Sequence, residues 1–427
     1  MIGTALFILL LLMALAIPVA ASLGMLALAL DALFSQLPLT RAMGEVAWSA
    51  SNEFLLMSVP LFILLGEILL RSGFAERMYG ALIKWVSWLP GGLMHSNIAA
   101  CGMFAATSGS SVATAATVGT VALPQARRFG YNERLFLGTL AAGGTLGILI
   151  PPSINMIIYA VLTNTSVPKL YLAGIVPGLV LVLLFMLTVV ILCLIKPAWG
   201  GRKFNATWGE RIASLPHLLP PLGIFLVVVG SIYGGVATPT EAASLGVVAS
   251  LGQAWWAGKL SFGMLKEAVE GTMRSTAMVM LIFVAAYFLN FVISAIGLTT
   301  LLTNFIEHLG LSPAWMLFAV IVFYVILGCF METLSMMITT IPIIAPVMFK
   351  LGYDPIWFGI LIILLIETAL VTPPVGLNLF VVQNLRKSGS LNDVIIGTLP
   401  FVVTLFAMLA LLSFVPGLAT WLPRQFG

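Results

Sequence analysis

Two short polar segments lie within long apolar stretches of this sequence, and their oxygen atoms are suited to binding ions. The first is Thr107-Ser108-Gly109-Ser110-Ser111, within an uncharged stretch over 91–126. The second is Met331-Glu332-Thr333-Leu334-Ser335, within 313–349. Hydroxyl, carbonyl and carboxylate oxygens are the ligands that hard cations prefer in proteins. The two segments are therefore candidate cation sites.

Each polar segment is followed by a predicted helix that a proline pair interrupts. Proline has no N–H for the carbonyl four residues back, so each pair frees two carbonyl oxygens. The freed carbonyls are those of Gly147 and Ile148 before Pro151-Pro152, and of Ala369 and Leu370 before Pro373-Pro374. Free carbonyls inside a membrane are costly unless a ligand binds them. The pattern predicts a sodium site at each break, and a simple proline kink is the alternative.

The composition shows which elements must hold these groups. Of 427 residues, 61% are hydrophobic and only 8% are charged, whereas soluble domains carry about 25% charged residues. A soluble enzyme, a nucleic-acid-binding protein and a disordered chain are excluded, because so much apolar surface cannot be hidden from water. Each helical crossing needs about 20 apolar residues. The expected fold class is an all-α polytopic membrane protein, with a retained first helix near the N-terminus.

The two halves of the chain resemble each other at a constant offset of about 222 residues. The matches are Ala20-Ala21-Ser22-Leu23-Gly24 with Ala242-Ala243-Ser244-Leu245-Gly246, Pro124 with Pro346, Gly130-Tyr131 with Gly352-Tyr353, and Pro151-Pro152 with Pro373-Pro374. Repeats of this length in membrane proteins are typical of transporters. We expect a first repeat over 1–196, a cytoplasmic linker over 197–222 and a second repeat over 223–427.

The distribution of basic residues in the loops favours inverted topology of the two repeats. The loops over 127–134, 196–216 and 386–392 hold three, four and two basic residues, and the positive-inside rule places them in the cytoplasm. The segment over 253–274 argues against this arrangement with three basic residues, and we interpret it as an amphipathic helix in the interface. The N-terminus is then periplasmic, and equivalent loops of the two repeats lie on opposite sides of the membrane.

The stretches that carry the polar segments are too short to cross a membrane twice. Two arms of about 15 residues are each about 22 Å long, against a hydrocarbon core of about 30 Å. Re-entrant helical hairpins are therefore expected over about 91–126 and 313–349, followed by broken helices over about 134–163 and 355–385. Two ordinary spans, with Ser and Thr bonding to their own helix, are the alternative.

These motifs resemble the large membrane subunit of tripartite ATP-independent periplasmic (TRAP) transporters, along essentially the whole chain. The resemblance rests on the Ser108–Ser111 tip, on Gly144–Ser153 and on Glu367–Gly376. It implies the ion transporter superfamily fold and sodium-coupled uptake of an organic anion, a carboxylate such as a C4-dicarboxylate or sialic acid, by an elevator motion. It also implies two partners in the bacterial inner membrane and periplasm, a small four-helix membrane subunit and a periplasmic substrate-binding protein.

The resemblance also implies which residues bind sodium and which bind the substrate. Mapped onto this chain, the sodium ligands are Ser108, Ser111, Gly147, Ile150 and Pro152, with Glu332, Thr333, Ala369, Thr372 and Pro374 in the second repeat. The substrate is expected at the hairpin tips and at the starts of the second half-helices, at Ser110, Ser153, Asn155, Ser335, Gly376 and Asn378. No enzymatic activity, transition metal or cofactor is expected, only sodium as the coupling ion.

Several alternatives stay open from the sequence alone. A stand-alone carboxylate carrier with inverted repeats or a sodium/proton antiporter shares the general architecture. A membrane enzyme or a proton-pumping subunit needs His ligands, Asp-rich motifs or intramembrane lysines, which the sequence lacks. Glu332 and Glu367 are candidate functional carboxylates, although Glu332 could instead cap a half-helix. Glu67 is expected to pair with Arg71, and Glu241 to cap a helix.

Overall fold

Helices joined by short turns and loops make up the part of the chain that the structure describes, and no strand lies within it. The computed structural model describes residues 1–426, except 16, 203–205, 299, 302–303, 305–311, 329–330, 374–375 and 387–388. Among these residues, five helices are long and apolar enough to cross a membrane, or up to seven if each bent helix pair is one span. The expected fold class, an all-α polytopic membrane protein, is confirmed.

The first half of the chain begins with peripheral helices and continues into a hairpin and a broken helix. These elements are α1 (Ile2–Ala14), α2 (Val19–Phe34), η1 (Leu39–Ala42), α3 (Met43–Ser51), η2 (Phe54–Met57), α4 (Ser58–Arg71), α5 (Phe74–Val86), α6 (Leu93–Ser108), α7 (Ser111–Phe129), α8 (Glu133–Leu149), α9 (Ile154–Thr163) and α10 (Val167–Ile195). Helices α8 and α9 meet at an angle of 43° across the Pro151-Pro152 break.

The second half repeats this order after a short helical linker. Its elements are η3 (Pro197–Gly200), α11 (Trp208–Ser214), η4 (Leu215–His217), α12 (Leu219–Tyr233), α13 (Pro239–Trp256), α14 (Phe262–Ala295), α16 (Pro313–Leu327), α17 (Thr333–Lys350), α18 (Pro355–Val371), α19 (Leu377–Arg386), α20 (Leu391–Phe414) and α21 (Gly417–Phe426). By the sequence offset, α6 to α9 correspond to α16 to α19.

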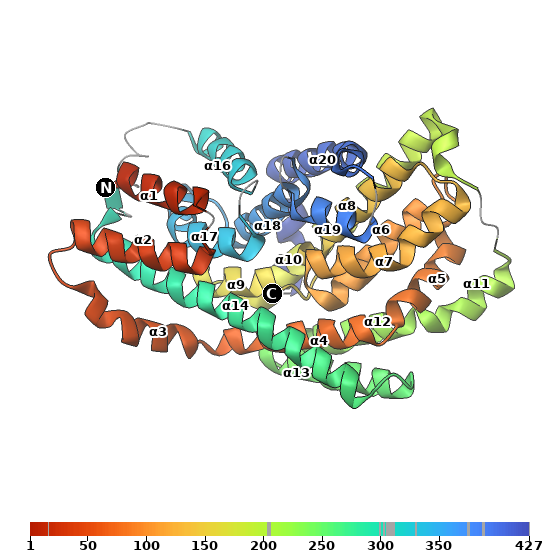
Figure 1. The fold of residues 1–427 in the computed structure, drawn as a ribbon, viewed down its shortest axis with the longest axis horizontal. Helices are drawn as coiled ribbons and strands as arrows, with labels where there is room; N and C mark the ends of the chain where they lie inside the picture. Colours follow the sequence, from red (N-terminus) through yellow and green to blue (C-terminus); the bar gives the residue numbers. More distant parts are fainter. Residues whose placement is uncertain are drawn as a thin grey trace.

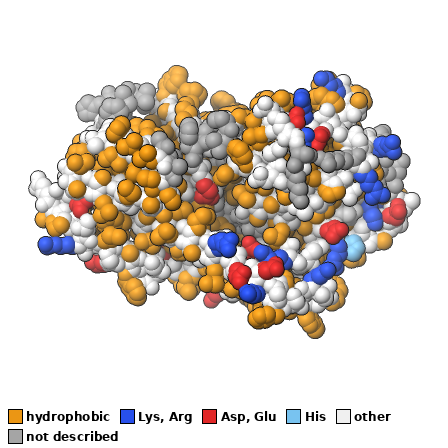
Figure 2. Space-filling model, viewed as in Figure 1, with side chains coloured by type: hydrophobic (Ala, Val, Ile, Leu, Met, Phe, Trp, Pro, Cys, Tyr) orange, Lys and Arg blue, Asp and Glu red, His pale blue; other side chains and the backbone are white. Residues whose placement is uncertain are grey.

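The two hairpins approach the middle of the molecule from opposite ends (Figure 1). Helices α6 and α7 lie to the right of the view and α16 and α17 to the left, while α4, α13 and α14 run along the lower edge. Hydrophobic side chains cover much of the visible surface, and many of the basic ones gather at the right-hand end (Figure 2). This surface suits a molecule whose middle is surrounded by lipid.

Helix α8 forms the centre of the first repeat, and glycine lets other helices approach it closely. Every residue from Leu135 to Leu149 is buried. A β-carbon on Gly138 would lie 1.9 Å from the carbonyl oxygen of Gly397 in α20, so these two backbones touch. Small residues permit such close helix packing in membranes. The tight packing holds the first broken helix in place.

Candidate ion and substrate site

Both hairpin tips and both broken helices meet at one small cavity. Its volume is about 80 Å³, and its wall includes Ser110 and Ser111 from the first tip and Glu332 and Thr333 from the second. Asn155 of α9 completes the polar part of the wall. Segments more than 200 residues apart in the sequence therefore line one cavity.

Four helices begin at this cavity. The first or second residues of α7, α9, α17 and α19 line it, namely Ser111, Val112, Ile154, Asn155, Thr333, Leu334 and Leu377. The N-terminus of a helix carries a partial positive charge and unsatisfied N–H groups. Helix N-termini favour an anion, and no Lys or Arg is among the described residues that line the cavity. The Glu332 carboxylate already occupies the start of α17, so the attraction for a further anion comes mainly from the other three helices.

Hydroxyl groups close the first hairpin tip. Ser108 Oγ lies 2.9 Å from Thr114 Oγ1, and the Thr114 hydroxyl also lies 2.7 Å from the Ser110 carbonyl oxygen. Ser110 caps α7 by accepting a hydrogen bond from the Ala113 N–H. Thr114 was not identified from the sequence, although its place one turn after Ser110 marks it as a residue that could bond back to the tip.

The first broken helix and this tip are in close backbone contact. A β-carbon on Gly147 would lie 2.5 Å from the Ser110 carbonyl oxygen, and one on Gly109 would lie 3.0 Å from the Pro152 carbonyl oxygen. The tip therefore rests directly on the break in the helix. The Ile150 side chain, in contrast, faces Gly178 of α10. The structure thus places Ser108, Gly147 and Pro152 in one region, and their role as sodium ligands stays a prediction.

A carboxylate organises the second hairpin tip. Glu332 accepts hydrogen bonds from the N–H groups of Leu334 and Ser335, at 3.1 and 3.2 Å, and so caps α17. The hydroxyls of Ser335 and Thr333 also donate to its carboxylate, at 3.3 and 2.8 Å. Glu332 is therefore both a helix cap and part of the cavity wall, so the two interpretations of this residue do not exclude each other.

Two buried polar groups at the cavity have no hydrogen-bond partner among the described residues. They are the hydroxyl of Ser111, which is 3% exposed, and the side-chain N–H₂ of Asn155, which is 2% exposed. A buried polar group without a partner costs roughly 1–3 kcal/mol. Because both residues line the same cavity, they are placed to bind an ion or a substrate there.

Other predicted residues lie near the cavity but bond within the protein. The Ser153 hydroxyl donates to the Ile148 carbonyl at 2.6 Å, which satisfies an oxygen that the Pro152 ring leaves free. The Thr372 hydroxyl donates to Thr368, and the Thr372 N–H donates to Ala369. The side-chain N–H₂ of Asn378 donates to the Ala141 carbonyl at 3.2 Å.

The backbone segments on the two sides of the second break also pack tightly against each other. Gly376 has a φ of +51°, and a β-carbon there would lie 3.1 Å from the Leu370 carbonyl oxygen. Pro374 lies outside the described residues. Neither Gly376 nor Asn378 is among the residues that line the cavity.

The remaining acidic candidates differ in their surroundings. Glu367 is fully buried in α18, and its carboxylate makes no hydrogen bond to a side chain among the described residues. Glu67 pairs with Arg71 one turn later, as expected, and Arg71 also contacts Glu267 of α14 at 3.4 Å. Arg71 therefore joins Glu67 of its own helix to Glu267 of α14.

Paired hairpins that meet at broken helices define this chain as a secondary membrane transporter, because such half-helices form the binding sites of transporters at mid-membrane. The family described as "Tripartite ATP-independent periplasmic transporter, DctM component" matches residues 6–418. The chain belongs to this family and is a large permease component of a transporter, not an enzyme.

Individual relatives agree with this assignment. The chain is 32% identical to the C4-dicarboxylate TRAP transporter large permease protein DctM of Vibrio cholerae, over 95% of this chain and 94% of that one. It is 32% identical to the ectoine TRAP transporter large permease TeaC of Halomonas elongata (86% of each chain), and 30% identical to the sialic acid TRAP transporter large permease SiaM of Vibrio cholerae (88% and 87%).

A solved structure shares the fold. It is the Alcanivorax borkumensis YdaH transporter, with a TM-score of 0.64, 15% sequence identity and coverage of 97% of this chain and 98% of that one. At this identity the likeness concerns the fold alone.

Proposed function

We propose that this chain carries out sodium-coupled uptake of an organic carboxylate across the bacterial inner membrane, with an elevator motion of the hairpin-bearing region. A periplasmic binding protein delivers the substrate, and a small four-helix membrane subunit completes the transporter. The N-terminus faces the periplasm. The relatives named for C4-dicarboxylates and sialic acid support a carboxylate substrate.

The convergence of four helix N-termini on one cavity carries this proposal. The termini attract the carboxylate, while the hydroxyls of the two tips and the Glu332 carboxylate supply oxygens for sodium. A bound sodium ion adds positive charge beside the anion site, so each ligand strengthens the binding of the other. This reciprocity couples the sodium gradient to uptake.

The coupling ion is tested by uptake into liposomes that contain this chain, the small subunit and the binding protein. We expect uptake that requires external sodium and that an inside-negative potential accelerates. If two sodium ions accompany one monoanion, one net charge enters, which is worth about 2.3 kcal/mol per 100 mV. Unchanged uptake with potassium in place of sodium would refute sodium coupling.

The same assay distinguishes the proposal from a stand-alone carrier. Uptake should depend on the binding protein and stop when it is omitted. Full uptake of the free substrate by the membrane chain alone would instead establish the stand-alone carboxylate carrier.

A further inference from the structure

A cavity separate from the hairpin tips lies where the linker between the two repeats meets α5 and α13, and we call it the linker cavity. Its volume is about 180 Å³, and its wall includes Phe74 and Arg77 of α5, His217 of the linker and Trp256 at the end of α13. Helices α5 and α11 lie at the end of the molecule where many basic side chains gather (Figures 1 and 2). The function proposed above gives this cavity no role.

The linker cavity joins segments that are far apart in the sequence. Helix α12 leaves the linker and α13 returns to it, where the side-chain N–H₂ of Gln253 donates to the Pro220 carbonyl at 2.9 Å. The segment over 253–274 is not an interfacial amphipathic helix, as its sequence suggests. It is the end of α13 and the first turns of α14, which Ser261 caps and no proline interrupts. Its first basic residue, Lys259, lies beside the start of α5 and thus near the linker, where the positive-inside rule expects it.

The wall of the linker cavity offers nitrogen donors without an acidic partner. The Arg77 guanidinium lies over the Phe74 ring, with Cζ 5.4 Å from the ring centroid, and forms no ion pair with the described residues. His217 lines the same cavity and has a ring N–H to donate. No Asp or Glu is among the described residues of the wall. Such a wall favours an anion, and a guanidinium group is especially suited to phosphate.

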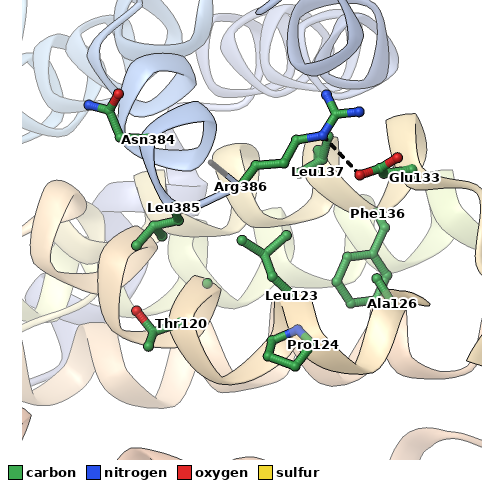
Figure 3. Close-up of a pocket in the computed structure, with 11 residues that line it drawn as sticks. Thr120, Leu123, Pro124, Ala126, Glu133, Phe136, Leu137, Asn384, Leu385 and Arg386 are labelled. Atoms are coloured by element: carbon green, nitrogen blue, oxygen red, sulfur yellow. Dashed lines mark hydrogen bonds and ion pairs between the residues drawn. The ribbon is translucent and has the colours of Figure 1, made fainter. Parts of the chain in front are cut away.

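A larger cavity shows the opposite arrangement of charge. Its volume is about 600 Å³, and α7, α8 and α19 enclose it. Figure 3 shows Arg386 at its edge, with Nε 2.8 Å from Glu133 Oε1. The Nη1 of the same arginine lies 3.1 Å from Asp393 Oδ2. Carboxylates of the protein therefore balance Arg386, whereas Arg77 has no such partner among the described residues, so the linker cavity is the better anion site.

Exposed aromatic side chains lie at the linker cavity and along the linker helix that leads to it. Trp256 in the wall is 81% exposed, and Trp208 at the start of α11 is 69% exposed. Ile212, one turn after Trp208, is exposed as well, and Arg211 lies over the Trp208 ring with Cζ 4.9 Å from its centroid. Apolar and aromatic side chains beside basic ones are typical of segments in the lipid headgroup region. This surface therefore favours an anion that belongs to a lipid over one in free solution.

We propose that the linker cavity binds the headgroup phosphate of an anionic phospholipid, with the linker helix lying in the membrane surface beside it. Arg77 and His217 donate hydrogen bonds to the phosphate oxygens, and Trp256 packs against the start of the acyl chains. Basic pockets between membrane helices bind anionic headgroups in this way. The lipid holds α5, the linker and the end of α13 at one depth in the membrane. The proposal does not depend on sodium coupling or on the transported substrate.

Lipid binding to the purified transporter tests this site. The chain, with its small subunit present, is titrated in detergent with phosphatidylglycerol, and native mass spectrometry gives the dissociation constant of the first bound lipid. Phosphatidylcholine, whose headgroup is zwitterionic, is the comparison. We expect Arg77→Gln to raise the dissociation constant for phosphatidylglycerol at least fivefold, and Arg77→Gln with His217→Gln at least tenfold. The constant for phosphatidylcholine should change less than twofold in both.

Arg128 provides a matched control. It is exposed and lies over an aromatic ring in the same way, with Cζ 5.6 Å from the Phe129 centroid, but it does not line the linker cavity. Arg128→Gln removes the same charge from the chain and should change the phosphatidylglycerol constant less than twofold.

The outcomes separate a lipid site from its alternatives. An unchanged dissociation constant in the double variant, or an equal loss in Arg128→Gln, would overturn the site, because binding would then follow the total charge of the chain. Inorganic phosphate in excess should leave the lipid bound, and displacement of the lipid by inorganic phosphate would show a site for a free anion instead. Absence of sodium-driven uptake with phosphatidylglycerol binding intact would overturn the proposed function and leave this site unaffected.

Discussion

The two hairpin tips occupy equivalent positions in the two repeats but are closed by different chemistry. In the first, neutral hydroxyls bond to one another and to the backbone, with Ser110 as the cap of α7. In the second, the Glu332 carboxylate takes the capping role and accepts four hydrogen bonds. The same backbone requirement, to satisfy N–H groups at a helix start, is thus met once without charge and once with it.

This difference places a negative charge on one wall of the cavity only. We expect ion binding at the second tip to depend on that charge, and ion binding at the first tip to depend on carbonyl and hydroxyl dipoles. Breaking each tip separately tests whether the two are equivalent in function as well as in position.

The largest effect is expected at the second tip. Glu332→Ala leaves four donors without an acceptor, and hydrogen bonds to charged groups are worth about 1.5–3 kcal/mol each. We therefore expect sodium-dependent uptake to fall at least 100-fold. A loss of ~2.8 kcal/mol, which is about one or two such hydrogen bonds, corresponds to that factor. Thr333→Ala removes one of these donors and should also abolish uptake. Initial rates in liposomes measure both, with folding checked by size-exclusion chromatography.

The variant Glu332→Gln tests the negative charge of Glu332 separately from its role as a helix cap. Glutamine keeps an oxygen for the N–H groups of α17 and removes the negative charge. Uptake that remains sodium-dependent with wild-type affinity in this variant would contradict a role of the charge and leave Glu332 as a cap alone.

A smaller effect is expected at the first tip. The Ser111 hydroxyl has no partner among the described residues, so Ser111→Ala removes no bond within the protein. We expect normal folding and a sodium concentration for half-maximal uptake about tenfold higher, from the loss of one ligand worth about 1.4 kcal/mol. Ser96→Ala is the matched control, because Ser96 is equally buried and unpartnered in α6 but does not line the cavity. Equal behaviour of the two variants would remove Ser111 from the site.

The comparison of the tips also shows how much of the fold and of the site could be predicted from the sequence. The fold class followed from composition and uncharged runs, since the cost of placing charges in lipid leaves few alternatives. The polar tips stood out because hydroxyls and Glu332 interrupt apolar stretches. That the two tips share one cavity is a finding of the structure.

The internal hydrogen bonds could not be predicted in the same way. Whether Ser153 binds a ligand or the Ile148 carbonyl depends on the angle at the helix break, which sequence spacing does not determine. Asn378 is a similar case, because its bond to Ala141 depends on how closely α19 approaches α8. The ion pair of Arg386 with Glu133 joins the ends of two helices that are far apart in the sequence, and no local pattern marks it.

Neutralising Arg71 or Arg134, two arginines near helix ends, should have little effect on substrate binding. Arg71 is paired with Glu67, and Arg134 with Asp393, and neither arginine lines the tip cavity. We expect Arg71→Gln and Arg134→Gln to change the apparent substrate affinity less than twofold, because helix N-termini and hydroxyls hold the carboxylate at the tips. A tenfold loss of affinity in either variant would show that a basic side chain reaches the substrate.

The smallest effect is expected at Glu241, a glutamate in a helix cap that does not line the tip cavity. Thr238 donates to its carboxylate through both the N–H and the hydroxyl, each at 2.8 Å, and the Glu241 N–H donates back to the Thr238 hydroxyl at 3.4 Å. This capping box confirms the role predicted from the sequence. The hydrogen bonds from Thr238 lower the pKa of Glu241 below its ordinary value.

A lowered pKa in the folded state means that the stabilisation by Glu241 is complete above the unfolded pKa of about 4.3, and is lost as the pH falls through the folded value. Between pH 6 and 8 the cap is therefore constant. Glu241→Gln should leave uptake at pH 7 within twofold of wild type, with any change in thermal stability small and independent of pH in that range. If Glu241→Gln instead lost as much uptake as Glu332→Gln, helix capping would explain both residues, and the charge at the second tip would have no separate function.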